Sequence, residues 1–441
     1  MPVHYQLTGR SASAISASVE AGIRTGGLPP GSPLPPIRTL AAELGVSPAT
    51  VASAYTALRQ RGLLESAGRA GTRVRERPAV SFRSAELLAV PENAVDLSSG
   101  APALDRLPRL APILASLDPA PVSYRDAGVL PELAAMARDR LAAEDIPATE
   151  IVLTSGALDG IERLLGAYVA PGDAVGIEDP GWANAIDLVA AMGLRAVPMP
   201  VDEHGPTLEG VTAALAAGVR AVIITTRAHN PTGAALSPER SAALRVLLAA
   251  HPDVLVIEDD HCGDLAEVPL YPLAGLTPAW AYIRSVSKAY GPDLRLAVVT
   301  GDPVTAGRVA GRQRFGAGWV STILQHAVLR MWSSSEVADQ VRTTSEVYRA
   351  RREALIAALA GHGLHATGRS GINVWVPVPD ETVAVARLRD LGWAVAPGAA
   401  YRLASPPALR ITISTLGAEQ VGPLAEAIFT AAAQVPGRGR V

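Results

Sequence analysis

Cysteine and lysine are almost absent from this sequence of 441 residues. Cys262 is the only cysteine, so the chain can form no intrachain disulfide and no cysteine-rich metal cluster, which is typical of a reducing compartment. Lys288 is the only lysine, and the other 38 basic residues are arginine. Arginine replaces lysine readily on a solvated surface, but a guanidinium cannot condense with an aldehyde as an amine does. The single lysine therefore indicates a position that needs an amine, and the alternative is chance combined with GC-rich coding bias.

Long hydrophobic runs are absent as well. No apolar run reaches the roughly 20 residues that span a bilayer, and the start MPVHYQLTGR lacks the basic and apolar regions of a signal peptide. We therefore expect a cytoplasmic protein that does not enter the membrane. With 49% hydrophobic and 18% charged residues the composition is that of a globular chain. Its length indicates two or three domains.

Positive charge is concentrated at the N-terminal end. Residues 1–78 contain nine arginines and four glutamates, a net charge of +5, whereas the whole chain has a net charge of −3 and the remainder therefore −8. A basic end of this kind predicts a polyanionic partner.

Hydrophobic periodicity in this basic end predicts three short helices and a hairpin. Ile15, Val19 and Ile23 would form one face of the first helix, and the second spans about 37–44 and ends at a glycine. Ser47 can cap a third helix that begins at Pro48. The segments 63–65 and 72–74 suit a two-stranded hairpin with Arg69 at its tip. The pattern predicts a winged helix-turn-helix over residues 1–75, with double-stranded DNA as its partner.

Residues 76–95 have no sustained periodicity and two prolines, and we interpret them as a linker. Beyond it, residues 96–435 alternate apolar strands with helical stretches, a pattern that predicts an α/β domain with a mostly parallel sheet. The strands are expected at 151–154, 174–177, 221–225, 254–258 and 281–285. Residues from about 335 to 435 suit a smaller α+β subdomain.

Polar residues gather where these strands end, and ligands bind at the carboxyl ends of such sheets. Gly156 and Ala157 start a helix whose N–H groups could hold a phosphate, although most such turns bind nothing. Trp182 could stack on an aromatic ligand, or it could be a core residue. Asn230 could donate to a ring oxygen, with an ordinary Asn-Pro turn as the alternative.

The later strands carry charged residues. One strand is followed by Asp259, Asp260 and His261, and a buried carboxylate there could pair with a protonated pyridine nitrogen, or these could be surface acids. Ser285 and Arg295 flank Lys288 and could grip a phosphate. Arg410 could bind a ligand carboxylate through a bidentate pair, and a structural salt bridge is equally compatible with the sequence.

Taken in order, these motifs resemble those of the fold-type I pyridoxal 5'-phosphate (PLP) aminotransferases. The order Ser-Gly-Ala, Pro-Gly-Trp, Asn-Pro-Thr-Gly, Asp, Ser-x-Ser-Lys, Arg and Arg covers most of residues 95–435. The N-terminal part resembles the GntR winged-helix regulators through LPPIRTLAAELGVSPATVASAYTALRQRGLL and GRAGTRV. The combination resembles the MocR subfamily of bacterial regulators.

The resemblance implies PLP as the cofactor and assigns a role to each matched residue. Lys288 would form a Schiff base, Asp259 would bind the pyridine nitrogen, Trp182 would stack on the ring and Asn230 would bind the ring hydroxyl oxygen. The phosphate would be held by Ser285, Arg295, Gly156 and Ala157, and by Tyr124 of the other subunit in a homodimer. Arg410 would bind the α-carboxylate of an amino acid.

Two positions depart from the MocR pattern. His261 stands where MocR proteins usually have a tyrosine that supports the ring hydroxyl, and Asn230 could compensate. Pro48 replaces the usual arginine of the recognition helix, which removes one DNA contact. The remaining candidates for DNA contact are Arg38, Ser47, Thr50 and Arg69.

The sequence leaves three functions open. The leading hypothesis is a regulator in which an amino acid or amine reacts at Lys288 and changes operator binding. A regulator that senses PLP itself would have the same site. The third is an active aminotransferase with an appended winged helix, so the sequence does not decide whether the chain is an enzyme.

Overall fold

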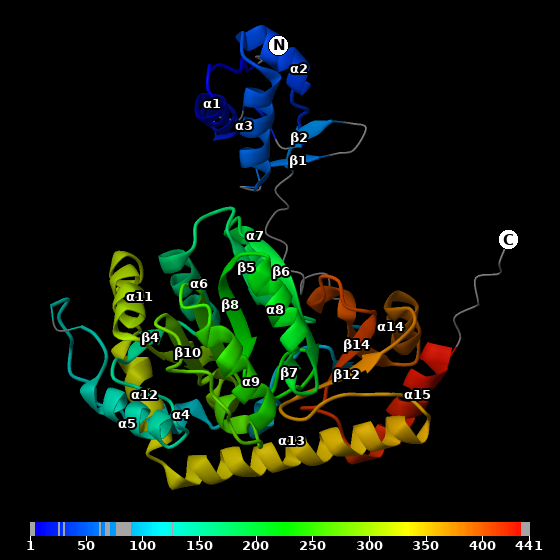
Figure 1. The fold of residues 1–441 in the computed structure, drawn as a ribbon. Coiled ribbons are helices and arrows are strands. Elements are labelled where there is room, and N and C mark those ends of the chain that lie inside the picture. Colours follow the sequence, from blue (N-terminus) through cyan, green and yellow to red (C-terminus); the bar gives the residue numbers. More distant parts are fainter. Residues whose placement is uncertain are drawn as a thin grey trace. The chain divides into compact units, whose positions relative to one another are not determined.

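The computed structural model describes residues 5–24, 27–29, 31–60, 63–66, 71–75, 90–125 and 127–433 (Figure 1). The chain divides into two compact units, the first of which contains residues 1–82. Among the described residues, no helix has the length and apolar character needed to cross a bilayer.

The N-terminal unit is a winged helix-turn-helix, as predicted. Three helices precede a small antiparallel hairpin, and their bounds are α1 (Ala12–Arg24), α2 (Ile37–Leu44), α3 (Pro48–Gln60), β1 (Leu64–Ser66) and β2 (Thr72–Val74). The apolar faces predicted from the sequence meet in one core, in which Ile15, Val51 and Leu58 are fully buried. The buried face of α3 therefore packs against both α1 and α2.

Local sequence signals fix the ends of these helices. Gly45 ends α2 in the left-handed conformation with φ 63°, and its N–H donates to Ala41 and Ala42 carbonyls. Ser47 Oγ accepts from the N–H of Thr50 at 3.1 Å and so caps α3. The predicted wing tip, Arg69, lies outside the described residues.

The larger unit is built on a mixed sheet of eight strands in the order β4-β11-β10-β9-β8-β5-β6-β7. The central strands β8, β9 and β10 are parallel, whereas β11 is antiparallel to both of its neighbours. The bounds are β4 (Val152–Thr154), β5 (Ala174–Asp179), β6 (Arg195–Asp202), β7 (Gly205–Pro206), β8 (Val219–Thr225), β9 (Leu255–Asp260), β10 (Trp280–Ser285) and β11 (Ala297–Gly301).

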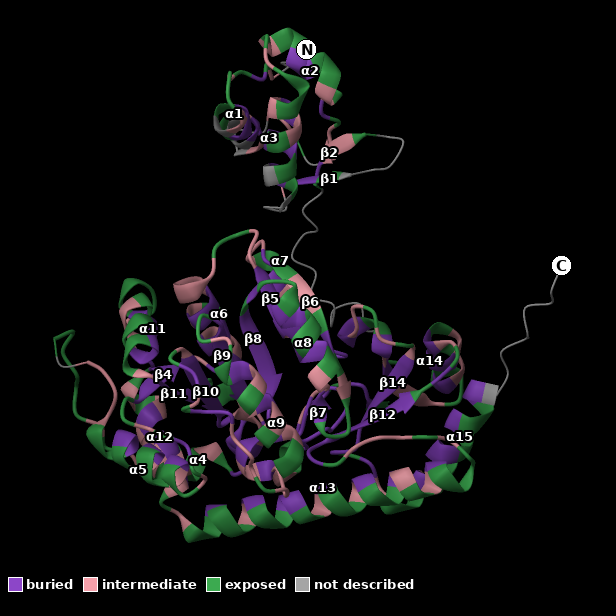
Figure 2. Ribbon diagram, viewed as in Figure 1, coloured by how far each residue is buried: buried purple, intermediate pink, exposed green. Residues whose placement is uncertain are grey.

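Helices pack on this sheet, and most of its strands are coloured as buried in Figure 2, whereas β6 is mostly intermediate or exposed. In the middle of the sheet, every residue of β5, β9 and β10 is buried, which explains why these segments are continuously apolar until their last residues. The helices of this part are α4 (Leu110–Ala115), α5 (Pro131–Ala142), α6 (Ala157–Tyr168), α7 (Ala183–Ala191), α8 (Leu208–Ala216), α9 (Pro238–Ala249), α10 (Ser287–Tyr290), α11 (Pro303–Phe315) and α12 (Thr322–Trp332).

A second, smaller sheet has the order β12-β14-β13-β3. The strands of this sheet and the helices of the same part of the chain are β3 (Val95–Leu97), α13 (Ser335–Gly361), β12 (Asn373–Pro377), α14 (Glu381–Asp390), β13 (Trp393–Pro397), β14 (Ala408–Thr412) and α15 (Val421–Ala433). The position of β3 differs from the prediction, because Val95 was assigned to the linker and instead starts a strand parallel to β13. The first strand of the larger unit therefore belongs to the small sheet and not to the eight-stranded one.

Candidate functional site

The carboxyl ends of β9 and β10 bring Asp259 and Lys288 into one region. The two strands are parallel neighbours, with Asp259 opposite Ile283. Lys288 lies three residues beyond β10 in the single turn α10, which packs against the segment that follows β9. The sequence order of the motifs therefore corresponds to neighbouring positions along one sheet edge.

Asp259 presents a carboxylate oxygen that the protein leaves without a partner. The residue is 2% exposed, and its Oδ1 makes no hydrogen bond within the described part of the chain. Its Oδ2 lies 3.4 Å from His261 Nδ1, and the His261 ring is stacked near Trp182 with 6.2 Å between centroids. A buried carboxylate beside two flat rings can accept a hydrogen bond from a cationic ring nitrogen.

The amine of Lys288 points toward the N-terminal segment of the larger unit, where Nζ donates to the carbonyl of Gly100. Lys288 is partly exposed, but protein atoms surround the amine densely and the loss of hydration lowers its pKa to about 8. A lysine with a lowered pKa has a larger neutral fraction near physiological pH, and the neutral amine is the nucleophile.

Arg410 is a buried cation without a carboxylate partner. It is 3% exposed, and no ion pair among the described residues includes it. Its Nη1 donates to Asn230 Oδ1 at 3.2 Å, its Nη2 donates to the carbonyl of Ser98, and the guanidinium lies 4.6 Å from the centre of the Tyr401 ring. Burial lowers the pKa of Arg410. The structure thus leaves the guanidinium available for an anionic group of a ligand, and offers no support for a structural salt bridge.

A candidate anion cradle lies at the start of α6. Gly156 has φ +98°, and a Cβ there would lie 2.7 Å from Arg295 Nη2, so the backbone and the guanidinium are in close contact. Arg295 Nη2 donates to the Ser155 carbonyl at 2.8 Å, and Ala157 is the first residue of the helix. Ser285 is the last residue of β10 and pairs with Ala297, the first residue of β11. Arg295 comes shortly before β11, so Ser285 and Arg295 lie at the same edge of the sheet. A helix N-terminus, a guanidinium and a hydroxyl in this arrangement suit a phosphate.

The structure places Tyr124 apart from these residues. Its side chain is 93% exposed and its ring contacts Trp319 edge-on, with 5.8 Å between centroids. Its predicted role at the site of a second subunit stays a prediction. In the N-terminal unit, Arg38 and Ser47 are exposed and Thr50 is half-buried, and Ser47 Oγ lies 2.9 Å from Thr50 Oγ1.

Three residues near Arg410 belong to the site but are not among the residues predicted from the sequence. Gly100 donates its N–H to Thr412 Oγ1 at 2.9 Å, and Thr412 Oγ1 donates to Asn373 Oδ1 at 3.1 Å. Side chains at i and i+2 of a strand share a face, so the position of Arg410 in β14 could have predicted Thr412. Gly100 lies in the segment that follows β3 and Asn373 is the first residue of β12, and no local signal connects them.

Chemically, the cluster combines an amine nucleophile, a carboxylate for a cationic ring, an anion cradle and a buried guanidinium. Within the described residues, no group of three or more histidine, cysteine or acidic side chains is arranged to hold a metal ion. The arrangement suits an anionic, aromatic molecule that reacts with an amine.

Each of the two units matches a known protein family. Residues 92–428 match the family "Aminotransferase class I and II", and residues 11–74 match "Bacterial regulatory proteins, gntR family". The larger unit resembles the kynurenine aminotransferase of Pyrococcus horikoshii, with a TM-score of 0.70 at 20% identity over 78% of this chain and 91% of that one. This likeness establishes the fold.

Two curated transcription regulators are similar to this chain, and the first of them spans both units. The vitamin B6 salvage pathway transcriptional repressor PtsJ of Salmonella typhimurium is 41% identical over 96% of this chain and 99% of its own length. The pyridoxine biosynthesis regulator PdxR of Corynebacterium glutamicum is 30% identical over 75% of this chain and 74% of its own. The chain therefore belongs to the MocR-type transcription regulators, in which a GntR winged helix is joined to an aminotransferase-like domain.

Proposed function

We propose that the chain is a cytoplasmic, vitamin B6-responsive regulator of transcription, and that PLP held at Lys288 is its signal. The observation that carries the proposal is that the only lysine lies just beyond β10, while the neighbouring strand β9 carries the buried, unpartnered Oδ1 of Asp259 near its end. The similarity to PtsJ and PdxR, both named for vitamin B6 metabolism, supports this choice of effector.

The residues of the site fit PLP group by group. The cofactor supplies an aldehyde and an electron-withdrawing ring when it is bound. Lys288 would hold the aldehyde carbon, Asp259 the ring nitrogen and Asn230 the ring hydroxyl oxygen. Trp182 and His261 would contact the ring. The cradle of Gly156, Ala157, Ser285 and Arg295 would hold the phosphate, completed by Tyr124 of a second copy in a homodimer.

The test is operator binding as a function of PLP. DNA fragments from upstream of the chain's own gene would be titrated with the full chain, with and without PLP, beside Lys288→Ala. We expect PLP to change the apparent Kd of the wild type about 5-fold or more, which is the usual range of allosteric coupling, and to leave that of Lys288→Ala unchanged. DNA binding that ignores PLP in the wild type would contradict the proposal.

Arg410 favours a second candidate function. Its buried guanidinium has no carboxylate partner in the described chain, so an amino acid could occupy the site together with PLP and be either the effector or a substrate. Turnover of amino-acid and keto-acid pairs, measured beside DNA binding, distinguishes the two. Brisk turnover without specific DNA binding would favour the aminotransferase.

A further inference from the structure

The turn of helix that carries Lys288 is too short to be stable by itself. α10 has four residues, whereas isolated helices need about 12 to 15 residues in water. Its orientation must therefore depend on what its side chains contact. Tyr290, two residues beyond the lysine, is 4% exposed and donates its hydroxyl to Asp264 Oδ2 at 2.6 Å. Burial and the adjacent carboxylate raise the pKa of Tyr290, so the hydroxyl stays protonated and remains a donor.

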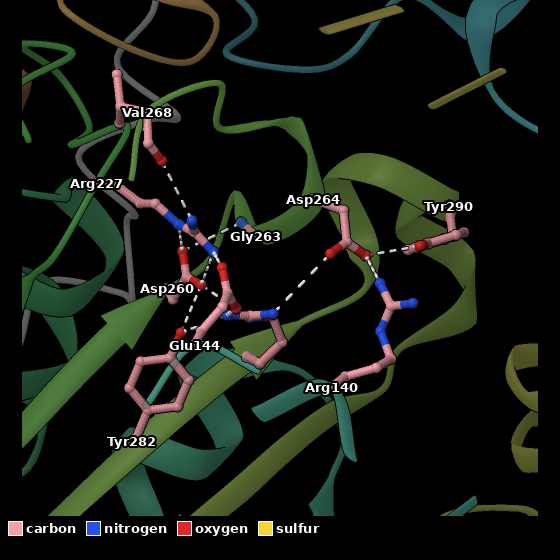
Figure 3. A network of polar contacts seen from close by, with 10 residues as sticks. Arg140, Glu144, Arg227, Asp260, Gly263, Asp264, Val268, Tyr282 and Tyr290 are labelled. Atoms are coloured by element: carbon pink, nitrogen blue, oxygen red, sulfur yellow. Dashed lines mark hydrogen bonds and ion pairs between the residues drawn. The ribbon is translucent and has the colours of Figure 1, made fainter. Parts of the chain in front are cut away.

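Asp264 belongs to the segment that follows Asp259 along the chain. It lies in the 3-10 turn η4 (Gly263–Leu265), against which α10 packs. Arg140 of α5 contacts the same oxygen, with 2.8 Å from Nη2 to Oδ2, and Figure 3 shows Asp264 between Tyr290 and Arg140. Asp264 therefore links the turn of Lys288 to the loop that leaves the end of β9.

An ionic cluster fixes the end of β9 itself. Asp260 is fully buried, and its Oδ2 lies 3.0 Å from Arg227 Nη2 and accepts from the Tyr282 hydroxyl at 2.6 Å (Figure 3). The same Oδ2 lies 2.8 Å from Arg284 Nε. Side chains alternate along a strand, so Asp260 is anchored on the face opposite to Asp259. Asp260 Oδ1 also accepts from the N–H of Gly263 at 3.2 Å, which continues the cluster into η4.

We propose that Tyr290, acting through Asp264, is a positioning residue that sets where the Lys288 amine lies relative to Asp259. The inference rests on the proposed function, because these two residues would hold opposite ends of the PLP ring. In covalent capture, the neutral Nζ would attack the aldehyde carbon, a C=N double bond would replace the C=O double bond, and the carbonyl oxygen would leave as water with the two protons of the amine. The position of the amine affects this covalent step, whereas the non-covalent binding of the ring and the phosphate does not depend on it.

The test compares two ligands that differ only at the reacting carbon. Pyridoxine 5'-phosphate has an alcohol where PLP has the aldehyde, so it fills the pocket without reacting. Kd values for both would be measured with the full chain, from the absorbance of lysine-bound PLP and from tryptophan fluorescence. Tyr290→Phe removes one hydrogen bond to a carboxylate, and we expect it to weaken PLP binding about 5- to 10-fold. Binding of pyridoxine 5'-phosphate should stay within about 2-fold, because no covalent step contributes to it.

Tyr168→Phe is the matched control, because Tyr168 on α6 also uses its hydroxyl in one hydrogen bond, with Thr305 of α11. It should bind both ligands as the wild type does. The inference would be overturned, and the proposed function left standing, if Tyr290→Phe bound PLP as tightly as the wild type does. The same conclusion would follow if Tyr290→Phe lost affinity equally for both ligands, or if Tyr168→Phe lost as much PLP affinity as Tyr290→Phe. If Tyr290→Phe does not fold, Asp264→Asn replaces it, with the same expected split. A wild type that does not capture PLP at all would overturn the proposed function and this inference with it.

Discussion

Several polar atoms at the site are buried without hydrogen-bond partners in the described chain, and their burial affects both the stability of the fold and the pKa of Lys288. Asp259 Oδ1, Ser287 Oγ and Arg410 Nε have no hydrogen bond within the described chain. Each such group costs about 1–3 kcal/mol when it is left unsatisfied. A ligand that supplies matching groups would therefore stabilise the folded chain. The lowered pKa of Lys288 has the same origin, because its ammonium form loses hydration.

The pH dependence of stability should reveal this lysine. Its pKa is about 8 in the folded chain and roughly 10.4 when unfolded. Between these values the unfolded chain binds the proton that the folded chain has lost, so stability rises with pH through this window. Without PLP, Lys288→Met should be more stable than wild type by about 2–3 kcal/mol at pH 7, and this advantage should shrink toward pH 10. Urea unfolding of both proteins at each pH measures it, and a constant difference would contradict the assignment.

The cradle at α6 predicts a phosphate-specific defect. A Cβ in Gly156→Ala would come within 2.7 Å of Arg295 Nη2 and displace it. We expect PLP affinity to fall about 10-fold, equivalent to about 1.4 kcal/mol, while pyridoxal, which has no phosphate, should bind as to wild type. Gly218→Ala is the control, because Gly218 also has a positive φ but nothing lies within 4 Å of its added Cβ. A similar loss for pyridoxal would show that the cradle does not hold the phosphate.

Among the elements, α3 is the one through which the N-terminal unit would read DNA. Its start depends on Ser47, whose Oγ caps the helix and also contacts Thr50 Oγ1. The sequence predicted this cap and the buried stripe of α3 because both are local patterns. The DNA contacts of Ser47 and Thr50 remain predictions, and the capping bond gives Ser47 a structural role in addition.

Ser47→Ala should therefore lower the stability of the N-terminal unit by about 1 kcal/mol and weaken DNA binding several-fold. Ser237→Ala is a matched control, since Ser237 caps α9 through a 3.1 Å bond from Arg240 N. It should destabilise the larger unit by a similar amount and leave DNA affinity unchanged. Thermal unfolding and DNA titration measure both effects. DNA affinity that is equal in the two variants would argue against α3 as the recognition helix.

Arg38, exposed on α2, tests the electrostatic part of DNA recognition. A phosphate contact releases counterions, so Arg38→Ala should weaken operator binding and lower the slope of log K against log salt by about 1. Arg349, exposed in α13, provides the control Arg349→Ala. A salt slope that does not change in Arg38→Ala would remove this residue from the interface.

For the whole molecule, the separate parts of the site were predictable to different degrees. Asp259 lies near the end of β9, whereas Asn230 and Lys288 follow β8 and β10, and local patterns predict these strands and the residues at their ends. The Arg410 environment was not predictable in this way, because Ser98 and Gly100 lie more than 300 positions from their partners in β14, with a separation of 312 residues. The pairing of β3 with β13 also joins segments far apart in the sequence, which explains why the sequence does not predict β3 as part of the small sheet.

The proposed coupling of the two ligands must be reciprocal. If PLP changes the affinity for operator DNA by a given factor, operator DNA must change the affinity for PLP by the same factor. Titration of each ligand in the presence and absence of the other measures both factors. A large effect in one direction with none in the other would mean that PLP acts on DNA binding by another route, such as assembly of the chain.

The central claim is the covalent bond between Lys288 and PLP, and the most direct measurement is to trap it. The full chain would be incubated with PLP, reduced with borohydride and digested, and its peptides would be examined by mass spectrometry. We predict one phosphopyridoxyl group per chain, on the peptide that contains Lys288, and none in Lys288→Ala. No stable adduct, or an adduct on the N-terminal amine alone, would contradict the account.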